Sequence, residues 1–254
     1  MLTSIRGLAA ATFLAAAAFA AAPALAQDAE PASNGGFSVS GSATLVTDYR
    51  FRGVSLSGGD PAIQGGITIN HDSGFYVGTW ASSIDDGGTD VFGDVEVDLF
   101  GGWSGDVSEG VGIDVGLLYY AYPSNAKGLK AEFFEPYANI STTLGPVEAK
   151  LGVNYAIDNS ALADDSLYIH TELSAGIPQT PLTLSAHLGY TDGIFAPTLL
   201  GAPFTDDTAL DWSLGVSATV LGSLTLGVTY TGVEGPSFDG LTDDAIVGSI
   251  GVSF

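Results

Sequence analysis

The chain has 254 residues, no cysteine, and 29 acidic against 6 basic side chains, for a net charge of −23. This acidity argues against nucleic acid as a partner, because nucleic-acid binding depends on cationic contacts with phosphates. The lack of cysteine excludes disulfides and thiolate metal sites, so backbone pairing and burial must hold the fold.

The first 26 residues have the pattern of an export signal. Arg6 precedes an apolar run at 8–22, and the small residues of 24–26 form a cleavage site before Gln27. A transmembrane anchor is the alternative, but the run is short and rich in alanine. We expect cleavage between Ala26 and Gln27, which leaves 5 basic against 29 acidic side chains and a net charge of −24. A short flexible lead-in is expected at 27–36.

Twelve segments in which apolar and polar residues alternate come next, and this period indicates strands with two different faces. The last segment alternates most regularly and ends on an aromatic residue, Phe254. About ten residues suffice to cross a bilayer at a tilt, and an open strand edge in lipid must be closed by another strand. The segments span 37–52, 63–70, 75–84, 94–103, 111–122, 133–142, 147–156, 166–177, 182–191, 209–220, 224–233 and 245–254.

The connections between these segments alternate in length. Short ones lie at 71–74, 104–110, 143–146, 178–181 and 221–223; longer ones lie at 53–62, 85–93, 123–132, 157–165, 192–208 and 234–244. Bacterial outer-membrane barrels have an even number of strands, short periplasmic turns and longer extracellular loops. We therefore predict an all-β fold over 37–254, a transmembrane antiparallel up-and-down β-barrel of about twelve strands. A secreted β-sandwich is the alternative.

The positions of charged and aromatic residues support strands with an apolar outer face and a polar inner face. Of the 29 acids, 15 lie in the long connections. The nine acids on strands take the parity opposite to the apolar residues: Asp48, Asp94, Glu96, Asp98, Asp114, Glu135, Glu148, Glu172 and Asp211. Aromatic residues gather near both strand ends, as interfacial girdles do. Those near short turns are Phe37, Phe75, Trp103 and Phe254; those near loops are Tyr49, Tyr119, Phe134, Tyr155, Tyr190, Trp212 and Tyr230.

Four blocks carry a family resemblance: YRFRGVSLSGGDPAIQGG at 49–66, GFYVGTWASSID at 74–85, VEVDLFGGWSG at 95–105 and FFEPYANIS at 133–141. In these blocks the chain resembles the TorF-family porins of Gram-negative bacteria, and the likeness is looser after Ala156. The resemblance implies an outer-membrane barrel with channel function. It also implies that the barrel-assembly machinery recognises the terminal Phe254. It names no solute.

The predicted lumen has two kinds of wall. The last three strands and the first point Ser, Gly and Thr inward, which leaves room unless a loop or 192–208 folds in as a plug. The outer end of the first strand and the middle strands supply predicted pore-lining charges: Arg50, Arg52, Asp94, Glu96, Asp98, Glu135, Glu148, Lys150, His170, Glu172 and His187. Arg50 and Arg52 should face Asp94, Glu96 and Glu135 at similar height. That arrangement would form either a charge-selecting constriction or salt bridges within the wall.

Paired aspartates precede three of the strands that descend from the long loops, and they are predicted to ring the outer mouth: Asp164, Asp165, Asp206, Asp207, Asp243 and Asp244. Such a ring would concentrate cations or bind Ca²⁺ through carboxylate oxygens. Solvated loop ends are the alternative interpretation of the same residues.

Three histidines exist, His71, His170 and His187. If the turn at 178–181 sets the register, His187 lies opposite Glu172, with Ser174 and Ser185 nearby. A Ser-His-acid hydrolase or a two-histidine, one-carboxylate metal site could be drawn there. Polar residues lining a channel explain the same residues, so we predict no enzyme, no cofactor and no metal.

Together these features predict an outer-membrane channel for passive diffusion of small hydrophilic solutes with a preference for cations. Its other expected partners are membrane lipid and lipopolysaccharide. The alternative is a plugged barrel whose acidic outer loops bind a partner, divalent cations or lipopolysaccharide. Conductance in a planar bilayer separates the two.

Overall fold

The structure is a computed structural model that describes residues 36–85, 87–88, 91–127, 129–157, 162, 164–200 and 206–254. The expected export signal and nearly all of the lead-in lie outside these residues and stay predictions. Among the described residues, no helix is both long and apolar enough to cross a membrane.

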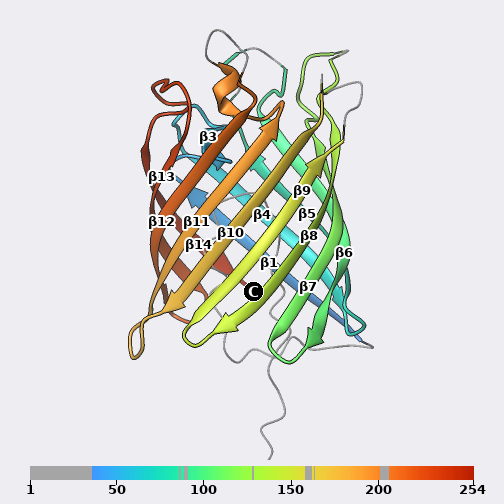
Figure 1. The fold of residues 1–254 in the computed structure, drawn as a ribbon, viewed down its shortest axis with the longest axis vertical. Coiled ribbons are helices and arrows are strands. Elements are labelled where there is room, and N and C mark those ends of the chain that lie inside the picture. Colours follow the sequence, from blue (N-terminus) through green and yellow to red (C-terminus); the bar gives the residue numbers. More distant parts are fainter. Residues whose placement is uncertain are drawn as a thin grey trace, which may run out of the picture.

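Twelve antiparallel strands within the described part close into one barrel (Figure 1). They are β1 (Phe37–Val46), β4 (Ala62–His71), β5 (Phe75–Ser83), β6 (Val95–Ser108), β7 (Val111–Ala121), β8 (Phe133–Leu144), β9 (Val147–Ala156), β10 (Ser166–Gly176), β11 (Leu182–Gly193), β12 (Thr208–Val220), β13 (Leu224–Val233) and β14 (Ala245–Ser253). A separate two-stranded sheet pairs β2 (Arg50–Phe51) with β3 (Val54–Ser55), and one short 3-10 helix, η1 (Pro197–Leu200), precedes β12. The predicted fold class is confirmed.

Most strand bounds agree with the alternation in the sequence. The bounds of β9 and β13 are those predicted, 147–156 and 224–233. The largest difference among the short turns is at β6, which continues to Ser108, so the predicted turn at 104–110 shrinks to Glu109 and Gly110. Gly110 has a φ of 74°, which suits glycine in so tight a turn.

The barrel closes where the last strand meets the first. β1 pairs with both β4 and β14. Beyond β14, Gly41 N donates to Phe254 O at 2.9 Å and Phe254 N donates to Gly41 O at 3.0 Å. The Phe254 ring lies over Gly41, where a Cβ would stand 2.6 Å from ring carbon Cζ. This seam pairs the backbone groups that an open edge would leave unpaired in lipid.

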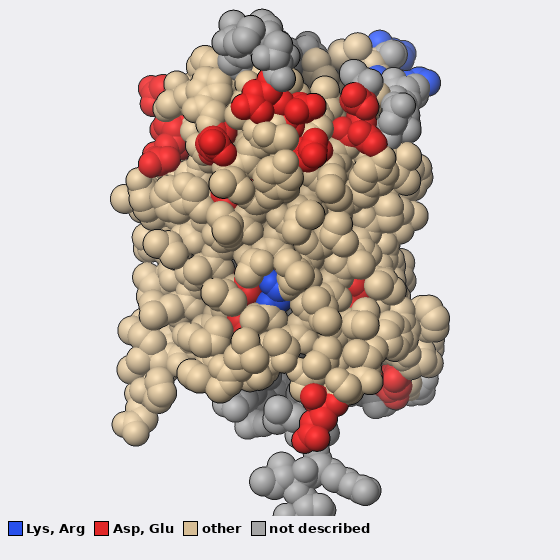
Figure 2. All heavy atoms as spheres, viewed as in Figure 1, with Lys and Arg blue, Asp and Glu red and all other residues tan. Residues whose placement is uncertain are grey.

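The outer surface has an apolar waist and an acidic rim. Figure 2 shows acidic side chains gathered at the loop end of one face, above a broad band with almost no charge. Exposed aromatic residues flank the band as predicted, with Phe37 and Phe75 at the turn end and Phe134 and Tyr230 toward the loops. Tyr49 does not belong to this girdle, because it is 1% exposed and lies inside the barrel.

Candidate functional site: the barrel interior

The chain leaves the wall after Val46, so the predicted strand at 37–52 is wrong beyond that residue. Residues 47–61 turn inward, and β2 and β3 form a hairpin in the upper half of the barrel (Figure 1). The turn residues Arg52 and Gly53 have φ values of 49° and 81°, and positive φ at both positions is typical of a type I′ hairpin turn. A Cβ on Gly53 would stand 2.7 Å from Cβ of Val233. The tip of this inward hairpin therefore reaches the wall at β13.

Asp48 and Arg50 tether the base of the inward hairpin. Asp48 accepts from Arg50 Nε at 2.5 Å and from Ser55 Oγ at 2.6 Å. Arg50 also donates to the carbonyl oxygens of Leu241 and Asp243, at 3.2 and 2.9 Å. Arg50 thus connects the hairpin to the loop before β14, and its contacts are not with Asp94 or Glu96, which sequence analysis had placed at its height.

Arg52 connects the hairpin tip to the opposite wall. One guanidinium nitrogen lies 2.6 Å from Glu135 Oε2 on β8, and both side chains are buried. The guanidinium carbon lies 4.2 Å above the Tyr168 ring, within the range of a cation–π contact. Glu135 accepts a second hydrogen bond from Asn154 at 2.7 Å. Further contacts are needed to make a buried ion pair favourable, and these supply part of them, although Arg52 Nε and Nη1 have no hydrogen-bond partner within the described residues.

Aromatic and aliphatic side chains fill the space around the hairpin. Phe51 contacts Tyr120 and Phe195, at ring centroid distances of 6.0 and 6.1 Å, and Phe195 lies 5.1 Å from Phe133. Phe195 lies between β11 and η1, so this connection also contributes a side chain to the filling. The buried apolar cluster includes Tyr49, Trp80, Ile84, Phe100, Leu118, Tyr120, Tyr122, Phe133 and Tyr137.

The predicted carboxylates of β6 are buried among these side chains. Glu96 accepts from Tyr49 Oη at 2.8 Å and from Tyr122 Oη at 3.3 Å. Burial raises the pKa of Tyr49 well above its ordinary value, and Glu96 raises it further, so Tyr49 stays a protonated donor. Asp98 is 1% exposed, and neither carboxylate oxygen has a hydrogen-bond partner within the described chain. Asp94 is exposed and lies just before β6, outside the interior.

Tyr76 and Tyr137, which the sequence analysis did not identify as site residues, lie along the inner wall between β5 and β8. Tyr76 donates to Asp114 at 2.5 Å and hydrogen-bonds to Tyr137. These side chains lie flat over Gly102 and Gly116, where a Cβ would stand 2.6 Å from the Tyr76 hydroxyl and 2.5 Å from the Tyr137 hydroxyl, respectively. Glycines at inward positions beside tyrosines could have indicated this arrangement in the sequence.

A polar cluster joins β9 to β12 on the inner face. Glu172 pairs with His187 across β10 and β11, and Ser174 with Ser185, as the turn at 178–181 predicted. Glu172 lies 2.8 Å from Lys150 Nζ and 3.3 Å from His170 Nδ1. His187 Nε2 lies 2.9 Å from Asp211 Oδ1 and 2.8 Å from the Tyr168 hydroxyl. The cluster brings together four predicted site residues, and it adds Asp211 and Tyr168. Glu148, also predicted, accepts from Ser174 at 3.3 Å.

The remaining wall, from β11 through β14 to β1, carries small inward side chains. These residues face inward as predicted, because neighbours on this face contact one another. A Cβ on Gly215 would meet the hydroxyls of Ser185 and Thr229, and a Cβ on Gly227 would meet the hydroxyl of Ser249. Several inward residues here are half-buried, and Ser42 is exposed although it faces the lumen. This small-residue wall thus borders open space, unlike the wall of β6 to β8.

Only some carboxylates of the predicted acidic ring are exposed to solvent in the described structure. Asp164, Asp206, Asp207 and Asp244 are exposed. Asp165 accepts from Tyr155, Asp244 accepts from Tyr230 at 2.7 Å, and Asp243 turns toward Arg50. Several members therefore bind the rim of the wall, and the arrangement is looser than a closed ring.

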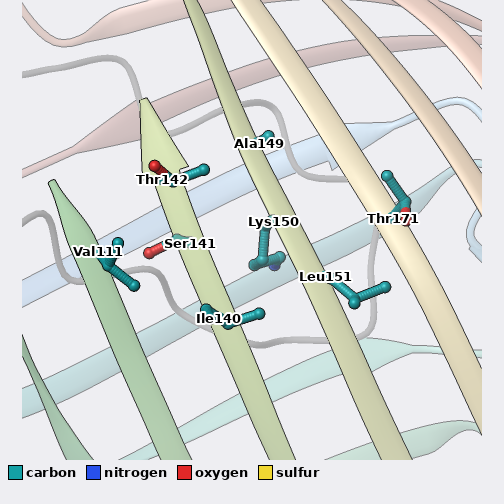
Figure 3. Close-up of a pocket in the computed structure, with 8 residues that line it drawn as sticks. All are labelled: Val111, Ile140, Ser141, Thr142, Ala149, Lys150, Leu151 and Thr171. Carbon is teal, nitrogen blue, oxygen red and sulfur yellow. The ribbon is translucent and has the colours of Figure 1, made fainter. Parts of the chain in front are cut away.

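A groove of about 270 Å³ lies on the outer surface over β7 to β10 (Figure 3). Ile140 and Leu151 are exposed on this face, and small neighbours such as Ala149 leave the dent between them. The accessible part of the lining is almost wholly apolar, which suits lipid chains rather than a polar solute. The lining residues are Val111, Ile140, Ser141, Thr142, Ala149, Lys150, Leu151 and Thr171.

Residues 28–248 match a family described as bacterial proteins of unknown function, Gcw_chp. The chain belongs to the Gcw_chp family. This match does not test the TorF resemblance, which stays a prediction. A search of curated protein sequences finds no match.

Solved structures share the fold of this Gcw_chp barrel. The NanC porin aligns with a TM-score of 0.56 and 11% identity over 85% of this chain and 99% of that chain. The KdgM porin aligns with a TM-score of 0.56 and 9% identity over 85% and 98% of the two chains. An outer membrane channel from Pseudomonas putida F1 aligns with a TM-score of 0.50 and 11% identity over 89% and 98%. At these identities, the similarity shows the fold alone.

Proposed function

We propose that this protein is an outer-membrane channel for passive diffusion of small hydrophilic solutes, and that the inward hairpin narrows its outer half. The observation that carries the proposal is the small-residue wall, whose polar inward side chains stay partly exposed inside a closed barrel. Such a wall leaves a hydrated path beside the filled side. No covalent step is needed for this function.

The surroundings of the barrel follow from its outer surface. The apolar waist with aromatic flanks suits the hydrocarbon of an outer membrane, and lipopolysaccharide would surround the acidic loop rim. Phe254, exposed at the closing seam, is the residue that the barrel-assembly machinery would recognise.

Acid excess supports a preference for cations. KdgM has been solved in complex with disordered oligogalacturonate, an acidic sugar chain. Exposed acids at the loop end, such as Asp164, Asp206 and Asp207, would repel an acidic chain, so we propose a different solute, neutral or cationic. Exposed charges are screened beyond about 8–10 Å near physiological ionic strength, so the preference should weaken as salt rises. Reversal potentials across a salt gradient measure it.

The hairpin offers a direct test. Leu56 N donates to Tyr49 O at 2.7 Å, so residues 50–55 can be replaced by Asn-Gly, a two-residue turn suited to this pairing. Single-channel conductance in a planar bilayer should rise, and cation selectivity with it, because Arg50 and Arg52 leave the lumen. A matched control shortens the turn at 178–181 on the opposite rim and should leave conductance unchanged. Anion selectivity in the wild type would overturn the proposal.

One observation favours the second candidate, the plugged barrel. The hairpin spans the interior from Glu96, through Tyr49, to Val233 on β13. If neither the wild type nor the folded hairpin variant conducts, the channel proposal fails. The acidic outer loops would then bind a partner, divalent cations or lipopolysaccharide.

A further inference from the structure

The polar cluster on β10 and β11 contains three groups suited to one metal ion. His170, Glu172 and His187 each offer a ligand atom, and these atoms lie within 4.8 Å of one another. The strand register fixes this proximity, because Glu172 and His187 are directly paired and His170 is two residues from Glu172 on the same face.

The contact between His170 and Glu172 is not a well-formed hydrogen bond. His170 is 9% exposed, and its Nδ1 has no hydrogen-bond partner in the described chain. That nitrogen faces Glu172 Oε1 at 3.3 Å. The ring packs against Gly152, where any Cβ would clash with it, so the wall is shaped to hold the ring in this place. Buried polar atoms without partners are rare in folded proteins and call for an explanation.

Neighbouring groups hold the other two ligands in position. Asp211 Oδ1 lies 2.9 Å from His187 Nε2, and the Tyr168 hydroxyl lies 2.8 Å from the same nitrogen. A carboxylate that orients a histidine in this way is typical of protein metal sites. Lys150 occupies Glu172 Oε2 at 2.8 Å, which leaves Oε1 toward His170.

We propose that His170, Glu172 and His187 bind a divalent transition-metal ion, with Zn²⁺ as the reference ion, on the inner face of the barrel. Two imidazoles and one carboxylate suit Zn²⁺, Ni²⁺ or Cu²⁺ rather than Ca²⁺, which prefers oxygen ligands. The ion would keep its remaining positions open to water in the lumen. This site does not depend on whether the barrel conducts.

Isothermal titration of the folded full-length barrel in detergent with Zn²⁺ tests the site. The titration is done in excess Ca²⁺, which saturates the carboxylates of the loops. Ca²⁺ should not compete for the proposed site, because it prefers oxygen ligands. His170→Ala and His187→Ala should abolish binding, while Asp211→Asn should weaken it about 10–100-fold because a supporting carboxylate is lost. His71→Ala is the matched control, since His71 is the remaining histidine and lies at the turn end of β4, away from the polar cluster. Lys150→Met should tighten binding by removing a nearby positive charge.

Heat-modifiable gel mobility confirms that each variant is folded. Electron paramagnetic resonance of Cu²⁺ bound to the wild type needs no variant, and should show hyperfine coupling to imidazole nitrogens. Unchanged Zn²⁺ affinity in both folded histidine variants, or a Cu²⁺ spectrum without nitrogen coupling, would overturn the site. Either result would mean that the cluster is a polar network of the wall.

Discussion

The wall of β6 to β8 and the wall of β12 to β14 have the same backbone pairing and opposite interiors. On the first, inward Glu96, Asp98 and Glu135 are at most 1% exposed and lie among aromatic side chains. On the second, inward Ser217, Thr229 and Ser249 remain half-buried. Hydrogen bonding alone therefore does not decide whether a barrel of this size is filled. The volume of the inward side chains and one hairpin decide it.

The largest expected effect comes from breaking the filled wall at its ion pair. Glu135→Gln leaves the buried Arg52 uncompensated, which should cost about 3–5 kcal/mol of unfolding free energy. Urea unfolding in lipid vesicles, followed by tryptophan fluorescence, measures this loss. Arg52→Met combined with Glu135→Leu should recover most of it, and the exposed loop change Asp206→Asn should have little effect. A loss below about 1 kcal/mol for Glu135→Gln would mean that the pair is not coupled.

A second change compares the two faces of the small-residue wall. Val228 is 51% exposed in the middle of β13, and the next residue, Thr229, faces the lumen. Val228→Arg should cost about 2–4 kcal/mol, because the charge would meet the bilayer, whereas Thr229→Arg meets water. Folding yield into vesicles reports both. Equal losses at the two positions would contradict the assigned facing.

The smallest expected effect compares glycines on the two walls. A Cβ on Gly116 would stand 2.6 Å from Tyr137 Cζ and 2.7 Å from the Gly101 carbonyl oxygen. On Gly227 it would stand 2.5 Å from Ser249 Oγ, a hydroxyl that can rotate away. Gly116→Ala should cost about 1–3 kcal/mol, as overpacking does, and Gly227→Ala clearly less. Thermal melting of the two variants measures the difference, and the reverse order would contradict the filled and open walls.

Strand positions were predictable because lipid and lumen impose opposite demands on alternate residues. The bounds of β9 and β13 could be predicted from this period alone. The alternation wrongly predicted a wall strand at Tyr49 to Arg52, because apolar and polar residues also alternate in a hairpin packed inside a barrel. Arg at a positive φ is uncommon, so the turn at Arg52 carried no strong signal. Apolar inward residues such as Leu118 and Tyr120 could have indicated that the lumen was filled there.

The polar cluster was half predictable. The turn at 178–181 set the register that pairs Glu172 with His187. Asp211 and Tyr168 join the same cluster from other strands through their side-chain directions, which alternation does not specify. Residues 201–205 and 158–161 lie outside the described structure, so the loop parts of the predicted mouth stay predictions there.

The tether of Arg50 has a consequence for the order of folding. Its carbonyl partners, Leu241 and Asp243, lie 191 and 193 residues further along the chain. Contacts so distant in sequence form late, because closing long loops must precede them. The hairpin is synthesised early, yet it can dock only after β13 and β14 have arrived. Until then its apolar side chains remain open to chaperones and proteases, so docking of the hairpin marks completion of the barrel.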